Sequence, residues 1–256
     1  MPSWDANLYL QFGTQRTQAA IDLTARISIG SPARVIDLGC GPGNSTEILR
    51  QRWPEADITG LDTSADMIAQ ASERDLDVTW VTGDIATWSP EDAFDIVFTN
   101  AALQWLPNHE KLLAQLMNHV VTGGVLAVQL PYHHASPLQQ VVLKASRDPQ
   151  WNDAMDSARN ALTYATTGFY YDTLQPLCNK LDLWETEYIH IMDDPVDIVD
   201  FIRGSGLRPF TQALNSEEEV QRFEKIVLQG YTNAYPPQAD GRILFPFRRQ
   251  FIIAHQ

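Results

Sequence analysis

A glycine-rich turn between a predicted strand and a predicted helix constrains the fold of this chain more than any other feature. Residues 37–44 read Asp-Leu-Gly-Cys-Gly-Pro-Gly-Asn; they follow the apolar run 33–38 and lead into the helical spacing of 44–53. Glycines at such a turn permit positive φ and let the backbone approach a ligand closely, and the helix start supplies free N–H groups. The segment predicts a ligand-binding loop in an α/β fold, the alternative being a turn that serves packing alone.

The spacing of the glycines argues against the two common phosphate-binding loops. A dinucleotide fingerprint needs a third glycine where Asn44 stands, and a P-loop needs a lysine that does not follow. What is present is an acidic residue, Asp37, two positions before Gly39, Gly41 and Gly43. An acidic strand end complements a cationic ligand rather than a phosphate.

This pattern resembles the cofactor loop of class I methyltransferases, which bind S-adenosylmethionine and release S-adenosylhomocysteine. Because this cofactor carries an ammonium and a sulfonium but no phosphate, the loop needs no lysine. The resemblance implies that the cofactor binds at Asp37, Gly39, Gly41, Gly43 and Asn44.

Apolar runs alternate with helical spacing through the first half of the chain, the pattern of a parallel sheet with crossover helices. After the first strand, strands are predicted at residues 57–61, 78–81, 94–99 and 124–130, and helices at 65–71 and 109–120. Helical spacing then covers residues 136–180 and 197–230, with strands at 184–192 and near 242–254. With the resemblance, this predicts an α/β fold built on a doubly wound, mostly parallel, seven-stranded Rossmann-like sheet.

We expect one methyltransferase domain over residues 1–256, since no repeat, low-complexity tract or linker interrupts the sequence. Residues 1–30 are expected to form a helical segment over the cofactor, and residues 31–131 the cofactor-binding core. Two helical insertions, 132–182 and 193–241, are expected to form a lid over the methyl acceptor, because long insertions above a sheet often cover a functional site.

Polar residues follow the predicted strands at the sheet edge where open α/β folds bind ligands. Asp62 ends the second strand about twenty residues after the glycines, the position of the acid that binds ribose hydroxyls in such folds. Thr63 and Met67 come just after it and are candidates to line the adenine edge.

The resemblance adds roles for residues at the next two strand ends. It implies that Asp84 accepts a hydrogen bond from the adenine amino group, that Ile85 packs on the ring, and that the main chain of Asn100 meets the methionyl ammonium. Taken alone, Asp84 reads more readily as a helix cap; together with Asp37 and Asp62, the cofactor role is favoured.

The resemblance extends past the cofactor core to the trans-aconitate 2-methyltransferases, which esterify a carboxylate of a small tricarboxylic acid. The matching positions run nearly from end to end of the chain: Trp4, Tyr9-Leu10, Phe12, Arg16, residues 37–46, 51–54, 103–107, 124–129 and 206–209, Tyr235-Pro236 and residues 240–244. Several lie outside the cofactor core, so the similarity is specific to this family.

Methyl transfer to a carboxylate is mainly a problem of orientation. A carboxyl group with a pKa near ~4 is already ionised at neutral pH, so no acid or base catalyst is expected. Gln104 and Trp105 are the predicted positioning residues, Gln104 as a donor to the acceptor carboxylate. Tyr9 and Trp105 are candidates for cation–π contact with the sulfonium, with a core aromatic as the alternative for Trp105.

A multiply charged acid also needs cationic partners, and arginine matches a carboxylate best. Arg16, Arg203 and Arg208 are the predicted acceptor-binding arginines, each with a solvated surface role as its alternative. Tyr170, in an aromatic run, is expected either to contribute a hydroxyl to the acceptor pocket or to pack the lid.

One segment departs from the family pattern. After the fifth predicted strand, residues 130–138 read Leu-Pro-Tyr-His-His-Ala-Ser-Pro-Leu, where the family would have Met-Pro-Asp-Asn followed by Glu-Pro-Thr-His. His133 is a candidate donor to an anion, and no metal site is predicted because no third ligand is evident. The change leaves other acceptors open, such as a malonyl thioester or another small acid, as well as a binding protein without transfer activity.

The charge balance excludes several partner classes. With 18 Lys and Arg against 32 Asp and Glu, the net charge is −14, which disfavours nucleic acid and anionic membrane surfaces. The start lacks the features of a secretory signal, and two cysteines make no disulfide framework, so a cytoplasmic protein is expected. A small anionic carboxylic acid stays compatible, because a few placed arginines outweigh a diffuse surface charge.

Overall fold

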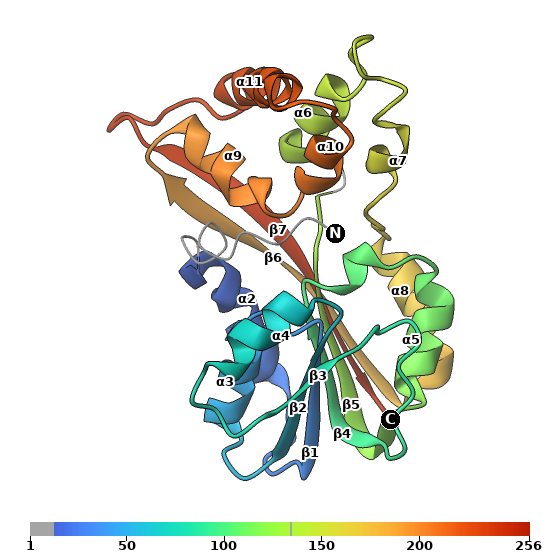
Figure 1. Cartoon of the computed structure of the whole chain (residues 1–256). Coiled ribbons are helices and arrows are strands. Elements are labelled where there is room, and N and C mark those ends of the chain that lie inside the picture. Colours follow the sequence, from blue (N-terminus) through green and yellow to red (C-terminus); the bar gives the residue numbers. More distant parts are fainter. Residues whose placement is uncertain (1–12, 134) are drawn as a thin grey trace.

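The computed structural model describes residues 13–133 and 135–256, apart from the side chains of residues 14–16. Its strands are β1 (Arg34–Leu38), β2 (Asp57–Asp62), β3 (Thr79–Thr82), β4 (Phe94–Asn100), β5 (Val120–Pro131), β6 (Lys180–Met192) and β7 (Ile243–His255). They form one sheet in the order β3-β2-β1-β4-β5-β7-β6, in which β7 runs antiparallel to β5 and β6 (Figure 1). The predicted seven-stranded, mostly parallel sheet is confirmed.

The helices of the first half are α2 (Gly13–Arg26), α3 (Asn44–Arg52), α4 (Ala65–Ser72) and α5 (His109–Met117), with a 3₁₀ turn η1 (Leu103–Trp105). The second half holds α6 (Pro137–Ala145), α7 (Asp156–Arg159), α8 (Thr167–Leu174), η2 (Gln175–Leu177), α9 (Pro195–Arg203), α10 (Arg208–Gln212) and α11 (Glu217–Ala234). The predicted helix 109–120 ends earlier, at Met117, because Val120 already begins β5.

Alternating apolar residues give the sheet two buried faces. Val35 of β1 packs with residues of α2 and α3, whereas its neighbour Ile36 packs with residues of α5 and α8 on the other face. This is the period-two alternation of a strand covered on both sides. The arrangement leaves the carboxyl ends of β1–β4 free to carry loops.

The later helices build a third core beyond the parallel sheet. Strand β7 pairs with β5 only as far as Arg249, opposite Pro131, and continues with β6 to Ile243. Helices α6, α9, α10 and α11 gather around this extension (Figure 1), and Phe245 and Phe247 of β7 pack there with Phe223 of α11. A helical layer therefore stands beside the edge where β5 ends.

Candidate active site

A large cavity lies at the carboxyl ends of the first four strands. Its wall consists of residues 39–42 after β1, 62–67 after β2, 84–85 after β3 and 100–102 after β4, together with Trp105, Leu106 and Arg208. Its volume of about 570 Å³ lies within the roughly 300–1,000 Å³ of small-molecule sites. Of the predicted cofactor residues, the structure places eight on this wall: Gly39, Gly41, Asp62, Thr63, Met67, Asp84, Ile85 and Asn100.

The glycine loop is shaped as a ligand cradle. Gly39 and Gly41 both adopt positive φ, +74° and +54°. A Cβ at Gly39 would lie 2.3 Å from the Cβ of Ala102, so only glycine fits there, whereas Gly41 faces open space. The loop thus brings bare backbone to the cavity wall, which suits a bulky nucleoside held by main-chain groups.

The carboxylate of Asp62 fixes two parts of this wall. Its Oδ2 accepts the Gly41 N–H at 3.0 Å, and its Oδ1 accepts the Ser64 N–H at 2.9 Å. Asp84 stands on the next strand end, and its Oδ1 accepts the Ala86 N–H at 2.9 Å. Asp84 therefore caps a turn rather than a helix, which was the alternative offered by the sequence, and it also lines the cavity. Asp66 also lines the cavity, so three aspartates stand on one wall, and this wall suits a cationic ligand rather than a phosphate.

Asp37 lies beneath the loop rather than on the cavity wall. It is fully buried, and its Oδ2 accepts the hydroxyls of Ser45 and Thr46, both at 2.7 Å. Burial raises the pKa of this carboxyl to about 6, against the effect of the two hydroxyls. The structure thus differs from the expectation of direct charge complementarity at Asp37: this residue holds the first turn of α3 against β1.

Gly43 and Asn44 also lie outside the described cavity wall. Gly43 has φ +85° and precedes α3, where a Cβ would meet Trp80 at 2.9 Å. The side chain of Asn44 accepts a hydrogen bond from Arg74, which also donates to the Pro42 carbonyl at 2.6 Å. Both residues therefore support the conformation of the loop without lining the cavity.

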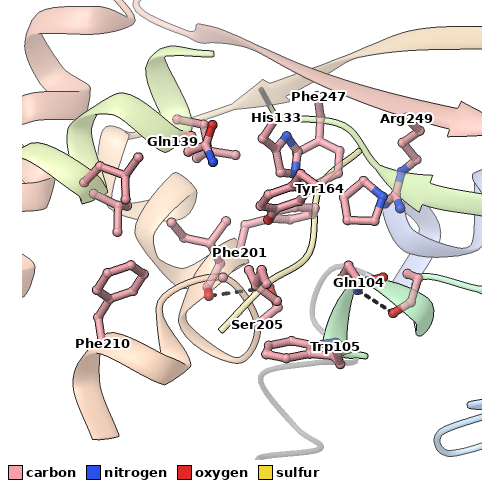
Figure 2. Close-up of a pocket in the computed structure, with 18 of the residues that line it drawn as sticks. Gln104, Trp105, His133, Gln139, Tyr164, Phe201, Ser205, Phe210, Phe247 and Arg249 are labelled. Carbon is pink, nitrogen blue, oxygen red and sulfur yellow. Dashed lines mark hydrogen bonds between the residues drawn. The ribbon is translucent and has the colours of Figure 1, made fainter. Parts of the chain in front are cut away.

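A second, smaller cavity lies between the parallel sheet and the helical layer (Figure 2). Its volume is about 160 Å³. The sheet side supplies Asn100, Ala101, Gln104, Trp105, Pro131, His133, Phe247 and Arg249, and the helical segments supply Leu138, Gln139, Val142, Leu143, Ala158, Arg159, Leu162, Tyr164, Phe201, Ile202, Ser205, Gly206 and Phe210. No Asp or Glu occurs among these described lining residues, in contrast to the larger cavity.

The two cavities meet at the end of β4. Asn100, Ala101 and Trp105 line both. Ala101 has φ +54°, a conformation that is strained for a residue with a Cβ and that is typical of functional sites. Gln104 Nε2 donates to the Ala101 carbonyl at 2.6 Å, and its Oε1 is buried with no hydrogen-bond partner among the described residues.

His133 forms an aromatic corner of the smaller cavity. Its ring stands edge-on to Phe247, with centroids 4.3 Å apart, and Tyr164 lies next to it at 6.2 Å. Burial and the charge of Arg249 lower the pKa of His133 to about 3. The imidazole is therefore neutral near pH 7, able to donate from one nitrogen and of little use as a base.

Three predicted acceptor residues have other positions. Arg203 does not line the smaller cavity: its Nε and Nη2 donate to the two carboxylate oxygens of Glu224 at 2.8 and 3.0 Å, joining α9 to α11. Arg208 lines the larger cavity. Tyr170 neither lines the smaller cavity nor packs the lid: it is buried in the sheet core beside α5, with its hydroxyl 2.7 Å from Nδ1 of His109. Tyr9 and the Arg16 side chain lie outside the described part of the chain.

Two arginines that the sequence argument did not select line the smaller cavity. Arg159 ties its segment together through the carbonyls of Ser146 and Asn152, both at 2.9 Å. Arg249 is 3% exposed and stands in β7. Strand alternation is the signal that identifies it, because Arg249 falls in the same register as the buried Phe247.

Comparison with known proteins identifies the family. Residues 35–124 match the family model described as a methyltransferase domain. The trans-aconitate 2-methyltransferase of Azoarcus sp. (strain BH72) is 42% identical over 254 residues, and that of Rhodopseudomonas palustris (strain BisB18) is 44% identical over 259 residues, with 99% of each chain covered in both cases. The chain belongs to the trans-aconitate 2-methyltransferase family. The predicted resemblance is confirmed.

Solved structures agree on the fold of this trans-aconitate 2-methyltransferase family member. The YcgJ protein of Bacillus subtilis superposes with a TM-score of 0.58 at 14% identity, covering 93% of this chain and 99% of its own. The plantazolicin methyltransferase BpumL, solved in complex with S-adenosylhomocysteine, gives 0.52 at 14% identity, covering 98% and 88%. The predicted enzyme class, an S-adenosylmethionine-dependent methyltransferase, is confirmed by the family membership and the matched methyltransferase domain.

Two further findings concern partners. Within residues 13–133 and 135–256, no helix has the length and apolar character that crossing a membrane requires. In the same part of the chain, no three His, Cys, Asp or Glu side chains are grouped so that they could hold a metal ion.

Proposed function

We propose that this enzyme transfers the methyl group of S-adenosylmethionine to a carboxylate oxygen of a small di- or tricarboxylic acid, with trans-aconitate as the first candidate. The observation that carries the proposal is the junction at Asn100, Ala101 and Trp105, which line both cavities. A nucleoside cofactor suits the larger cavity with its three aspartates, and a small acid suits the smaller cavity with its two arginines. The names of the relatives support trans-aconitate as the acid.

The chain's own residues would act by orientation and by exclusion of water. Bound S-adenosylmethionine supplies an electrophilic methyl group, and the acceptor carboxylate, with a pKa near ~4, is ionised without help from a base. Gln104 has a second N–H beyond the one given to Ala101, and Trp105 offers an aromatic face at the junction. Holding the two reactants in line there is the main contribution expected of the protein.

The helical segments are proposed to act as the acceptor lid. Leu138 and Val142 of α6, Phe201 of α9 and Phe210 of α10 all reach the smaller cavity. Residues 132–182 and 193–241 therefore supply most of the wall that would enclose the acid.

The altered segment favours a second acceptor class as the alternative. His133 and Leu138 belong to the residues that differ from the family pattern, and both line the smaller cavity. If these two side chains change which acceptor the smaller cavity binds, the acceptor would be a malonyl thioester or another small acid.

The test is a product assay with methyl-labelled S-adenosylmethionine against trans-aconitate, cis-aconitate, citrate, itaconate, succinate, malonate and a malonyl thioester. A base-labile methyl ester of trans-aconitate is the expected product. Labelling of only another acid or of the thioester would replace trans-aconitate. Cofactor binding by calorimetry without transfer to any member of the panel would overturn the proposed reaction.

A further inference from the structure

We propose that Arg249 is the residue that binds the carboxylate of the methyl acceptor. The inference rests on the proposed function, and it assigns the acid-binding role to a residue of β7 that was not predicted from the sequence. Its support comes from the placement of Arg249 along the strand, its tie to the junction between the cavities, and the charge of the surrounding wall.

The strand places Arg249 at a boundary between two cores. Phe251 packs in the core under α2 and α3, whereas Phe247 packs in the core of the helical layer. Arg249 stands between them in the same alternating register, opposite Pro131 at the end of β5. A guanidinium buried in a register of large apolar residues needs polar or charged partners.

Arg249 is tied to the point where the two cavities meet. Its Nη1 donates to Oε1 of Gln129 at 3.2 Å, and Gln129 is the register partner of Asn100, which lines both cavities. Its guanidinium lies over the Phe247 ring, 4.7 Å from the centroid. Figure 2 shows the Arg249 side chain extending from β7 in the direction of Gln104. The guanidinium is therefore held on the sheet side of the cavity, near the proposed site of transfer.

The wall around Arg249 suits an anion. No carboxylate occurs among the described lining residues, and His133 next to Arg249 is neutral at pH 7. The second cation, Arg159, donates to the carbonyls of Ser146 and Asn152 and pairs with the carboxylate of Asp156 at 3.1 Å, so Arg249 is the better candidate of the two. A carboxylate beside Arg249 would gain a charge-assisted hydrogen bond in a buried, largely apolar cavity, where such bonds are strongest.

The neighbouring residue provides a matched control. Arg248 comes directly before Arg249 in β7 and points to the opposite face of the sheet. There it is exposed and pairs with Glu187 at 3.4 Å. Removing either arginine changes the net charge of the protein equally. A comparison of Arg249→Gln with Arg248→Gln therefore separates a local role in binding from a general electrostatic effect.

The experiment measures the preference for a carboxylate over its neutral ester. Trans-aconitate, malonate and the fully methylated ester of each acid are titrated separately into enzyme saturated with S-adenosylhomocysteine. Calorimetry gives the Kd of each acid and of its ester. We expect wild type and Arg248→Gln to prefer the acids by about 30-fold or more, and Arg249→Gln to lose most of that preference while cofactor affinity stays within about twofold. Arg249→Lys should recover part of the preference for the acid. Because this variant keeps the positive charge, it also serves as the test if Arg249→Gln folds poorly.

Two results would overturn the inference: a wild-type enzyme that binds acid and ester equally, or an Arg249→Gln enzyme that keeps the wild-type preference. Neither depends on methyl transfer, so the labelled-product assay judges the proposed reaction separately. In that assay, Arg249→Gln should raise the acceptor KM by about tenfold or more, since a buried charged contact is lost.

Discussion

The backbone N–H of Gly41 donates to Oδ2 of Asp62 at 3.0 Å, which joins the glycine loop after β1 to the end of β2. The other carboxylate oxygen of Asp62 accepts the N–H of Ser64. An ionised carboxylate has about four acceptor positions, so two remain for ribose hydroxyls. One side chain thus builds the wall of the larger cavity, and we expect its remaining acceptor positions to bind the cofactor.

Replacing Asp62 by alanine should weaken cofactor binding severely. Loss of charged hydrogen bonds worth roughly 1.5–3 kcal/mol corresponds to about a 10- to 150-fold rise in Kd for S-adenosylhomocysteine, measured by calorimetry. Asp57→Ala, at the exposed start of the same strand, is the control and should leave Kd unchanged. An unchanged Kd in Asp62→Ala would remove this residue from the cofactor site.

Gly39→Ala should destabilise the protein more than positive φ alone requires. Its Cβ would lie 2.3 Å from the Cβ of Ala102, whereas Gly123 has a similar φ of +84° with nothing within 4 Å. Gly123→Ala therefore measures the conformational cost, about 1–2 kcal/mol, and Gly39→Ala adds the cost of moving Ala102. Urea unfolding of both variants checks this. Equal losses of stability in the two variants would mean that the loop moves to avoid the contact with Ala102.

Arg203→Gln should lower stability without changing the acceptor KM. The guanidinium joins α9 to α11 through Glu224, and because the pair is partly exposed its loss should amount to about 1 kcal/mol. Arg203 also pairs with Asp200 on its own helix, so Glu224→Gln, which keeps that pair, should show a smaller loss. The double variant should lose little more than Arg203→Gln, since the contact between Arg203 and Glu224 is already broken there. A raised acceptor KM in Arg203→Gln alone would restore the acceptor role predicted from the sequence.

The sequence predicted the cofactor half of this molecule far better than the acceptor half. The glycine loop and Asp62 follow from local spacing around successive strands, and the sheet order then brings them together at one edge. The acceptor cavity is assembled from β5, β7 and the later helices, which are distant in sequence. Arg203 was predicted to bind the acceptor because its partner Glu224 lies on another helix, distant in sequence. Arg249 was not predicted because its burial depends on the pairing of β7 with β5.

Arg208 provides a test of which half of the site it serves. It lines the larger cavity, where it is the only Lys or Arg among the described lining residues. We therefore expect Arg208→Gln to raise the Kd of S-adenosylhomocysteine by about tenfold, through lost contact with its carboxylate, and to change the acceptor KM little. Calorimetry and steady-state kinetics on one preparation separate the two effects. The opposite pattern would return Arg208 to the acceptor, as the sequence suggested.

The buried carboxyl of Asp37 should make stability depend on pH in an unusual direction. Burial raises its pKa from 3.8 to about 6 in the folded protein, so between these values the folded state keeps a proton that the unfolded state releases. The contribution of Asp37 to the free energy of unfolding therefore falls as pH rises from about 4 to about 6 and is constant above.

Asp37→Asn isolates this effect in the cofactor-free enzyme. At about 1.4 kcal/mol per pKa unit, the stability of wild type relative to Asp37→Asn should fall by on the order of 2–3 kcal/mol between pH 4 and pH 7, measured by urea unfolding. Ser45→Ala removes a hydroxyl bond that favours the ionised form, so it should raise the pKa further and move the change to higher pH. A difference that is flat or rises with pH would show that Asp37 is ionised in its buried position beneath the loop.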